Sequence, residues 1–268
     1  MDLQNKLNNL KNRLKQMETV AVAFSGGLDS TFLLKVAHDV LQERAIALTA
    51  HSFIFPEREF LEAEAFAKKI GCKHIAVTFN ELDIGGFADN PVNRCYLCKR
   101  DLFSRLLSVA RKNGLQHVID GSNTDDLGDF RPGIRALREL NIASPLQEAG
   151  MGKVDIKALS KEMGLLTWDK PSFACLSSRI PYHQKITREK LQAVDKAEQF
   201  LLNEGFKQVR VRHHGDTARI EVSANERGKF VDTALMDRVY ETFRQLGFLY
   251  VTLDLKGYRT GSLNEGMR

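Results

Sequence analysis

An alternation of apolar strand-like runs with amphipathic helical segments constrains the fold of this chain most. In the first segment, Leu3, Leu7, Leu10, Leu14 and Met17 repeat at spacings of four and three, as on one face of a helix. The expected strands span 19–24, 45–50, 74–79 and 117–120, and the expected helices span 3–17, a segment that begins near Asp29, 57–70 and 95–112. This order is typical of βαβ units, and it predicts an α/β fold with a parallel sheet covered by helices on both faces.

The pattern changes after about residue 182. An expected helix over 187–203 is followed by strands over 208–212 and 218–222, a helix that ends near residue 246, and a strand over 248–255. The order α-β-β-α-β indicates a second, smaller α+β domain with an antiparallel hairpin. We therefore expect two domains, residues 1–182 and residues 183–268.

Composition narrows the class of protein. The 268 residues are 43% apolar and 27% charged, as in ordinary globular proteins, so disorder and coiled-coil rods are excluded. No apolar run approaches the roughly 20 residues that cross a bilayer, and the polar N-terminus has no apolar signal core. We expect a cytoplasmic protein with no membrane partner. The 39 Lys and Arg against 34 Asp and Glu give +5, which suits small anionic ligands as well as RNA.

The segment 23–34, AFSGGLDSTFLL, joins the first expected strand to its helix through two adjacent glycines. Glycines allow positive φ angles and close approach of the backbone to a ligand, and the positive end of the helix favours an anion. Hydroxyl groups in the same turn add hydrogen-bond donors. The expected phosphate ligands are Ser25, Gly26, Gly27, Asp29, Ser30 and Thr31. The competing interpretation is a plain strand-turn-helix connection in which Asp29 caps the helix.

The turn is neither a Walker A motif nor a G-x-G-x-x-G motif. It resembles the S-G-G-x-D-S signature of the PP-loop ATP pyrophosphatases. That resemblance implies cleavage of ATP between its α- and β-phosphates, transfer of AMP to a substrate oxygen, and an adenine nucleotide alpha-hydrolase type of fold for about residues 1–180. It also implies that Asp29 is the acid on the Mg²⁺ or phosphate side.

Three cysteines have a spacing that suits a metal centre. Cys95 and Cys98 lie three residues apart at the start of an expected helix, so both thiols face one side, and Cys175 lies in a loop expected at the same edge of the sheet. Three thiolates on a 4Fe–4S cluster would leave one iron able to bind an external sulfide. A zinc site that includes His183, or unrelated buried cysteines, are the alternatives. Cys72 is expected to be a buried free cysteine.

Two further groups of polar residues suit an anionic ligand. Asp125, Asp126, Asp129 and Arg131 follow the fourth expected strand; we expect Asp126 to line the ATP or Mg²⁺ site, although turn capping competes for each of them.

Arg210 and Arg212 alternate along one strand, so both point to the same face and can grip a phosphate with forked hydrogen bonds. Ser178 and Arg179, next to Cys175, are expected to do the same. A solvated surface of the smaller domain is the alternative for these residues.

Nearly the whole chain resembles the LarE-type sulfur transferases. The motifs that carry the resemblance are the loop at 25–30, D-G-x-x-x-D-D-x-x-D-x-R-P-G at 120–133, C-x-S-S-R at 175–179, V-R-V-R at 209–212 and T-L-D-L-x-G-Y-R at 252–259. Family members adenylate a carboxylate of pyridinium dicarboxylate mononucleotide and convert it to a thiocarboxylate, in the biosynthesis of the nickel-pincer nucleotide cofactor.

The same resemblance implies roles for particular residues. Some members sacrifice the sulfur of the cysteine that matches Cys175; because Cys95 and Cys98 are also present, this chain is similar to the branch in which three cysteines hold a 4Fe–4S cluster that delivers sulfide. Cys175, Cys95, Cys98 and Asp29 are then the catalytic residues, with ATP and Mg²⁺ as further cofactors. The resemblance also implies that Glu198 lines the site, that sulfide or persulfide is the donor, and that a homo-oligomer assembles through the smaller domain.

Two rival functions remain open. A PP-loop tRNA thiolase would also combine the loop with a 4Fe–4S cluster, but it predicts a broad basic surface, and the sequence has no basic run, so nucleic acid is not the expected partner. A nucleotide-binding sensor of the universal-stress type would bind ATP without chemistry and would have no need of three cysteines.

Overall fold

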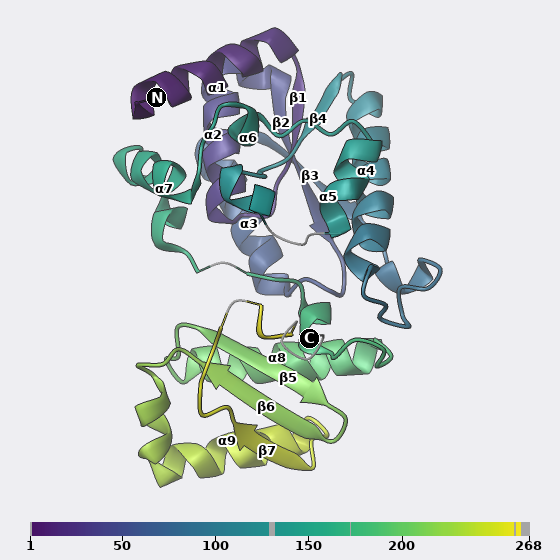
Figure 1. Cartoon of the computed structure of the whole chain (residues 1–268), viewed down its shortest axis with the longest axis vertical. Helices are drawn as coiled ribbons and strands as arrows, with labels where there is room; N and C mark the ends of the chain where they lie inside the picture. Colours follow the sequence, from purple (N-terminus) through teal and green to yellow (C-terminus); the bar gives the residue numbers. More distant parts are fainter. Residues whose placement is uncertain (1, 129–131, 172, 260, 264–268) are drawn as a thin grey trace. The chain divides into compact units, whose positions relative to one another are not determined.

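The computed structural model describes residues 2–128, 132–171, 173–259 and 261–263 (Figure 1). The chain forms two compact units, and each consists of two stretches of sequence. The first unit comprises residues 1–84 and 93–173, and the second comprises residues 85–92 and 174–268. In the second unit, Asn90 Nδ2 donates to the carbonyls of Ile180, at 3.2 Å, and Pro181, at 2.7 Å, which ties the inserted segment 85–92 to it. The domain boundary expected at residue 182 stays a prediction.

The first unit contains a four-stranded parallel sheet. Its strands, in spatial order, are β3 (Lys73–Thr78), β2 (Ala45–His51), β1 (Val20–Ala23) and β4 (His117–Ile119). The parallel arrangement and all four strands confirm the α/β prediction, with ends that differ by one or two residues. Because β1 and β2 are central and buried on both faces, their sequences are almost continuously apolar rather than alternating.

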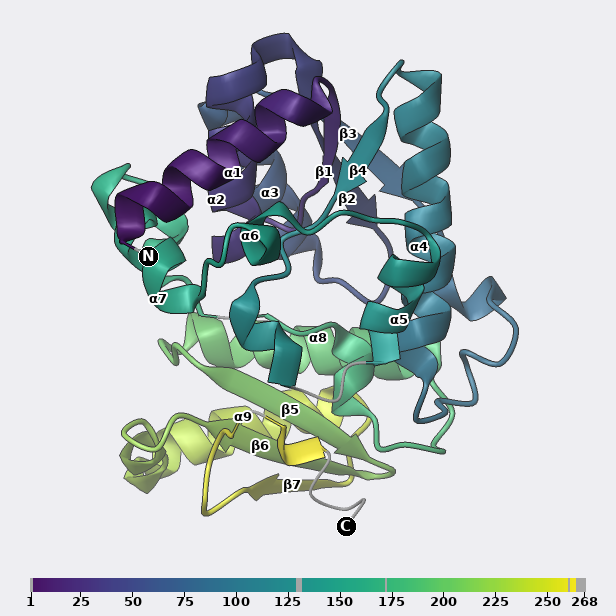
Figure 2. The same cartoon turned by 45° about the horizontal axis from the view of Figure 1, so that its top comes forward.

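Helices cover both faces of this sheet (Figure 2). One face packs against α1 (Leu3–Met17), α2 (Leu28–Leu41), α3 (Glu57–Ile70) and α7 (Lys153–Glu162). The other packs against α4 (Arg94–Lys112) and α5 (Pro132–Glu139). The short α6 (Pro145–Glu148) adds Leu146 to the first core. The stripe of leucines expected on α1 is buried there, and Asp2 begins the helix by accepting a 2.8 Å hydrogen bond from the Asn5 N–H.

The second unit is a three-stranded sheet with two helices on one face. The strand order is β5 (Val209–His214), β6 (Thr217–Val222) and β7 (Tyr250–Leu253), and the helices are α8 (Arg188–Asn203) and α9 (Thr233–Gln245). The expected hairpin of β5 and β6 is antiparallel, whereas β7 lies parallel to β6, because α9 provides the crossover that parallel pairing needs. Val211, Ile220 and Phe243 lie in the core between sheet and helices.

Short 3₁₀ turns, which the periodicity did not predict, fill several connections. They are η1 (Gln42–Arg44), η2 (Glu81–Asp83), η3 (Thr124–Gly128), η4 (Leu166–Asp169), η5 (Leu176–Arg179) and η6 (Arg227–Val231). Two of them, η3 and η5, carry residues expected in the site. None of the helices in the described ranges is long and apolar enough to cross a membrane.

Candidate functional site

The glycine turn after β1 requires glycine at Gly26 for two reasons. Phe24 N–H donates to the Leu48 carbonyl at 2.8 Å, and the chain then turns sharply into α2. Gly26 has a φ of +68°, and a Cβ atom there would lie 3.0 Å from both Cα and Cβ of Ala63 on α3. Both the left-handed backbone and the contact with α3 exclude a side chain at this position.

Hydroxyl groups hold the turn from inside. The Oγ atoms of Ser25 and Ser30 lie 3.1 Å apart, the Ser25 N–H donates to Ser30 Oγ at 3.3 Å, and Ser30 Oγ donates to the Gly27 carbonyl at 3.3 Å. Gly27 begins α2 without a side-chain cap, and Thr31 Oγ1 is buried without a hydrogen-bond partner within the described ranges. The turn is therefore preorganised, and its donors suit a bound phosphate.

Asp29, in the first turn of α2, has an unusual carboxyl group. Burial raises its pKa from 3.8 to about 6; Lys153 partly opposes this shift, Asp126 adds to it, and the neighbouring Asn123 amide opposes it. Asp29 Oδ1 is buried and has no hydrogen-bond partner among the residues described, and neither has Asn123 Nδ2. A carboxylate oxygen held in this state suits Mg²⁺, which one or two carboxylates commonly bind together with nucleotide phosphates.

The segment that follows β4 lies against the start of α2. A Cβ atom at Gly121 would lie 3.2 Å from the Ser30 backbone nitrogen, so this approach also depends on glycine. Asp126 Oδ2 accepts the Asn123 N–H at 3.0 Å, and Asp125 Oδ2 accepts the Lys153 N–H at 2.7 Å. The turn-capping interpretation thus fits one oxygen of Asp126, whereas Asp125 bonds the start of α7; the charge of both aspartates still reaches Asp29. Asp129 and Arg131 lie outside the described residues.

Two groups near the loop were missed by the sequence analysis. Lys170 Nζ donates to the Gly26 carbonyl at 3.3 Å and pairs with Glu59 at 2.8 Å and Glu62 at 2.6 Å on α3. Asn123 lies beside Asp29, as described above. The Asn123 position falls inside a segment that the sequence singled out, whereas nothing local to Lys170 signals that it reaches a loop 144 residues away.

The cysteines divide between the two units. Cys95 is exposed and Cys98 half-buried in the first turns of α4, as expected, and both belong to the first unit. Cys175 is half-buried in the second unit, where it begins η5. Over the described part of the chain, no three His, Cys, Asp or Glu side chains are grouped as ligands of a metal ion. The three-cysteine metal site therefore stays a prediction.

Cys72 is a buried free thiol, as expected. Its Sγ donates to the Ala45 carbonyl at 3.2 Å, and burial raises its pKa to about 11.

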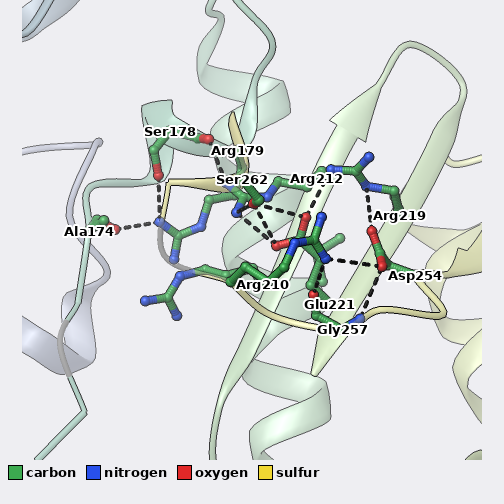
Figure 3. Close-up of polar contacts among 12 residues, drawn as sticks. Ala174, Ser178, Arg179, Arg210, Arg212, Arg219, Glu221, Asp254, Gly257 and Ser262 are labelled. Carbon is green, nitrogen blue, oxygen red and sulfur yellow. Dashed lines mark hydrogen bonds and ion pairs between the residues drawn. The ribbon is translucent and has the colours of Figure 1, made fainter. Parts of the chain in front are cut away.

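The face of the second sheet opposite α8 and α9 carries a cluster of charged side chains (Figure 3). Arg210 and Arg212 point to this face, as the alternation on β5 predicts, while Val209 and Val211 enter the core. They are 7% and 5% exposed, so the solvated-surface alternative is wrong for both of them. We call these residues the arginine cluster, together with Arg179 and its partner Glu198, which reaches the edge strand β5 from α8. Its members are Arg179, Glu198, Arg210, Arg212, Arg219, Glu221, Asp254 and Ser262.

Ion pairs within the arginine cluster link its strands. Arg212 Nη2 bonds Glu221 Oε2 at 2.8 Å and Ser262 Oγ at 2.8 Å, and Arg219 Nη2 bonds Glu221 Oε1 at 2.9 Å (Figure 3). Glu221 is completely buried.

Arginines outnumber the acidic residues in this cluster, and the excess positive charge affects the ionisation of Arg210. Burial and the neighbouring Arg179 lower the pKa of Arg210 to about 10, despite attraction by Glu198. Its guanidinium donates to the Val209 carbonyl at 2.6 Å and lies 5.1 Å from the centre of the Tyr258 ring. Four arginines against three acids leave a positive environment, which suits a phosphate group.

Arg179 and Glu198 form a completely buried forked pair. Nε and Nη2 of Arg179 bond the two Glu198 oxygens at 2.8 and 2.9 Å. Burial opposes ionisation of Glu198, but attraction by Arg179 outweighs it and lowers the Glu198 pKa. Glu198 Oε1 also accepts the Val211 N–H at 2.9 Å, which ties α8 to β5; that Glu198 lines the substrate site stays a prediction.

Comparison with known proteins identifies the fold and the family. Residues 1–86 match the model of the PP-loop domain, so the first unit is that of a PP-loop ATP-using protein. Pyridinium-3,5-bisthiocarboxylic acid mononucleotide synthase of Lactiplantibacillus plantarum is 40% identical over 94% of this chain and 91% of its own length. The chain belongs to the same family, the LarE-type ATP-dependent sulfur transferases.

Two further relatives match over almost their full length. A protein of Synechocystis is 45% identical over 98% of both chains, and one of Methanocaldococcus jannaschii is 31% identical over 95% of this chain and 98% of its own. The relationship therefore includes the second unit as well as the PP-loop.

Proposed function

We propose that this enzyme adenylates a carboxylate of pyridinium dicarboxylate mononucleotide and converts it to a thiocarboxylate, in the biosynthesis of a nickel-pincer nucleotide. The observation that carries the proposal is the near full-length relationship to the Lactiplantibacillus synthase, because a PP-loop alone occurs with several kinds of substrate. The arginine cluster of the second unit supports it, since a mononucleotide brings one phosphate that needs a cationic partner.

The first unit carries out the adenylation. Ser25, Gly26, Gly27, Ser30 and Thr31 bind the phosphates of ATP, with the backbone N–H groups of the turn and the start of α2 as the main donors. An oxygen of the substrate carboxylate attacks the α-phosphorus, the bond to the β-phosphate bridge breaks, and pyrophosphate leaves.

Asp29 and Asp126 complete the ATP site. Asp29, whose Oδ1 has no hydrogen-bond partner among the described residues, would hold Mg²⁺, and the ion would supply positive charge that offsets the negative charge of the departing pyrophosphate. Asp126 lies close enough to Asp29 to raise its pKa by charge repulsion. The negative charge of Asp126 would also strengthen the attraction between this site and the cation.

The second unit binds the substrate phosphate. We assign this role to Arg210 and Arg212, whose guanidinium groups share one sheet face, with the hydroxyl group of Ser178 as an additional donor; the Ser178 carbonyl accepts from Arg212. Arg179, expected from the sequence to share this role, has a guanidinium group that bonds Glu198 and backbone carbonyls.

The sulfur step exchanges one bond for another without redox change. Free sulfide adds to the acyl carbon of the adenylate; a persulfide donor would supply this sulfide only after a thiol reductant cleaves its S–S bond. The bond from that carbon to the AMP oxygen breaks, and AMP leaves with the electron pair. We propose Cys95, Cys98 and Cys175 as ligands of a 4Fe–4S cluster, which would hold sulfide on its remaining iron.

The cysteine environments fit this assignment in part. Cys95 and Cys98 lie one helical turn apart on α4 at exposed and half-buried positions, as two ligands of one cluster require. Cys175 precedes a short 3₁₀ turn in the second unit and is half-buried there.

A direct test measures pyrophosphate release with pyridinium dicarboxylate mononucleotide and, separately, with bulk tRNA. The proposal predicts release with the mononucleotide and no gel shift with tRNA. Release that depends on tRNA would instead establish the thiolase alternative, and ATP binding without release under either condition would favour a sensor.

A second experiment tests the cluster. Protein purified without oxygen is assayed for iron and acid-labile sulfide, and Cys95→Ala is compared with Cys72→Ala as the matched control in the same unit. Cys95→Ala should lose bound iron and repeated turnover but keep adenylation, while Cys72→Ala keeps both. Retained repeated turnover in Cys95→Ala would contradict the cluster.

The expected quaternary structure and location also remain proposals. We propose a homo-oligomer assembled through the second unit, which light scattering on the full-length protein tests, and action in the cytoplasm, where reducing conditions keep thiols available.

A further inference from the structure

Two arginines hold the turn that carries Cys175 by donating hydrogen bonds to its backbone carbonyls and to one hydroxyl group. Arg179 Nη1 donates to the carbonyl oxygen of Ala174, to the carbonyl oxygen of Cys175 at 3.1 Å and to Ser178 Oγ at 2.9 Å (Figure 3). Arg212 Nη1 donates to the Ser178 carbonyl at 2.9 Å. The backbone on both sides of the cysteine is thus fixed by side chains rather than by a regular helix or strand.

Arg179 is itself fixed by a chain of contacts that ends in the sheet. Its other nitrogens bond both oxygens of Glu198 on α8, and Glu198 Oε1 accepts the Val211 N–H on β5. Arg179 and Glu198 are completely buried. One guanidinium therefore connects the core of the second unit to the main chain at the cysteine.

This arrangement differs from that of a phosphate ligand. A phosphate would have to take the place of Glu198 or of the carbonyl oxygens, and Glu198 is a buried carboxylate that would then lose its cation. Arg210, in contrast, lies over the Tyr258 ring and donates to the Val209 carbonyl, and neighbouring positive charge helps to lower its pKa.

We propose that Arg179, held by Glu198, is a positioning residue that fixes the turn 174–178 and thereby the direction of the Cys175 thiol, and that it does not bind the substrate phosphate. The proposal rests on the proposed function in one respect, that the Cys175 sulfur takes part in sulfur transfer. The planar fork of arginine is essential to it, because lysine offers a single nitrogen that cannot bond Glu198 in a fork and still reach the carbonyls of Ala174 and Cys175.

The test compares Arg179→Lys with Arg238→Lys in the full-length, reduced protein. Arg238 forms a 2.7 Å ion pair with Glu204 on the surface of the same unit, so it is a matched control for the loss of an arginine–glutamate pair. Alkylation of Cys175 by iodoacetamide, without ATP or substrate, is followed by peptide mass spectrometry. We expect at least a fivefold faster reaction in Arg179→Lys and less than a twofold change in Arg238→Lys.

Kinetics separate positioning from phosphate binding. In Arg179→Lys, mononucleotide-dependent pyrophosphate release should keep its KM within twofold, while thiocarboxylate formation falls at least tenfold. A phosphate ligand would instead raise the KM of the mononucleotide at least tenfold. That result, or an unchanged alkylation rate, would overturn the proposal.

A second variant keeps the test decisive if Arg179→Lys does not fold. Glu198→Gln retains the shape of the side chain but removes the charge that holds Arg179, and it should show the same faster alkylation together with faster hydrogen exchange at residues 176–180. Unchanged values in folded Glu198→Gln would contradict the proposal. If the wild-type protein releases no pyrophosphate with the mononucleotide, the proposed function fails, whereas the alkylation result still decides the role of Arg179.

Discussion

The PP-loop of the first unit and the arginine cluster of the second unit differ in how their carboxylates are partnered. In the loop, Asp29 Oδ1 and Thr31 Oγ1 are buried without hydrogen-bond partners among the described residues, and a carboxyl pKa is raised by burial. In the arginine cluster, Glu221 and Glu198 each accept several hydrogen bonds and lie next to more than one arginine. The loop keeps its polar groups ready for a ligand, whereas the cluster uses most of its charges to hold the fold.

The difference follows from how each site is built. A glycine turn at a helix N-terminus presents backbone N–H groups at little cost in structure, so it can remain open until ATP arrives. Arginines on a sheet face must have acidic partners when they are buried, because an uncompensated buried charge is strongly destabilising.

The largest predicted effect comes from a substitution that removes the central carboxylate of the arginine cluster. Glu221→Gln leaves Arg212 and Arg219 without their shared carboxylate, and we expect a loss of about 3–5 kcal/mol in the free energy of unfolding. Urea unfolding measures it, with Glu204→Gln as the control, since the exposed Arg238–Glu204 pair should contribute less than about 1 kcal/mol. Equal losses in the two variants would show that the buried pairs are no more important than a surface pair.

The next largest effect is expected from a substitution that places a side chain inside the PP-loop. Gly26→Ala introduces a Cβ atom 3.0 Å from Ala63 and forces a residue with a side chain to a φ of +68°. Because displacement of a reacting group by an ångström reduces rates by about 100-fold, we expect at least that loss in pyrophosphate release. Gly114→Ala is the control: its φ is +73°, but nothing lies within 4 Å of its added Cβ atom. Gly114→Ala should be less stable and still active; loss of activity in both variants would place the effect in folding.

A smaller effect depends on pH. With a pKa of about 6, Asp29 is protonated at pH 5, and we expect Mg·ATP to bind about tenfold more weakly there than at pH 7.5. Since the folded-state pKa lies above the ordinary value of 3.8, ionisation of Asp29 costs stability as the pH rises through 6. Asp29→Asn should therefore be more stable than wild type above pH 6, while its weak ATP binding no longer changes with pH. Calorimetric titrations at several pH values measure the affinity, and a pH-independent wild-type affinity would contradict this account.

The smallest effect concerns Cys72, which belongs neither to the PP-loop nor to the arginine cluster. Cys72→Ala removes a buried sulfur and its hydrogen bond to Ala45, and we expect a loss of about 1 kcal/mol in the free energy of unfolding. Thermal unfolding measures the loss, and the rate of pyrophosphate release should stay within twofold of wild type. A large loss of turnover would give Cys72 a role that its burial does not suggest.

Much of the structure around the PP-loop could be predicted from local sequence. The apolar repeat and the closing glycine define α3 at Glu57–Ile70 without error, and S-G-G-x-D-S predicts the turn at the start of α2. Both signals lie within a few residues of the structure that they specify. Lys170, which reaches Gly26, gave no such signal, because its partners lie far away in the sequence.

The arginine cluster of the second unit was less predictable, because its contacts also join residues that lie far apart in the sequence. The alternation on β5 correctly placed Arg210 and Arg212 on one face, but their burial depends on segments brought together by folding, such as Glu221 on β6 and Ser262 near the C-terminus. The Arg179–Glu198 pair joins a loop to a helix 19 residues later, and no short-range pattern marks it. Charge alone could not show whether an arginine binds a ligand or another side chain.

The most direct test of the proposed function incubates the oxygen-free enzyme with Mg·ATP, sulfide and pyridinium dicarboxylate mononucleotide, and follows AMP, pyrophosphate and product mass together. The account predicts equal amounts of AMP and pyrophosphate, a product in which sulfur replaces one carboxylate oxygen, and more than one product per chain. Absence of pyrophosphate on addition of the mononucleotide would contradict it.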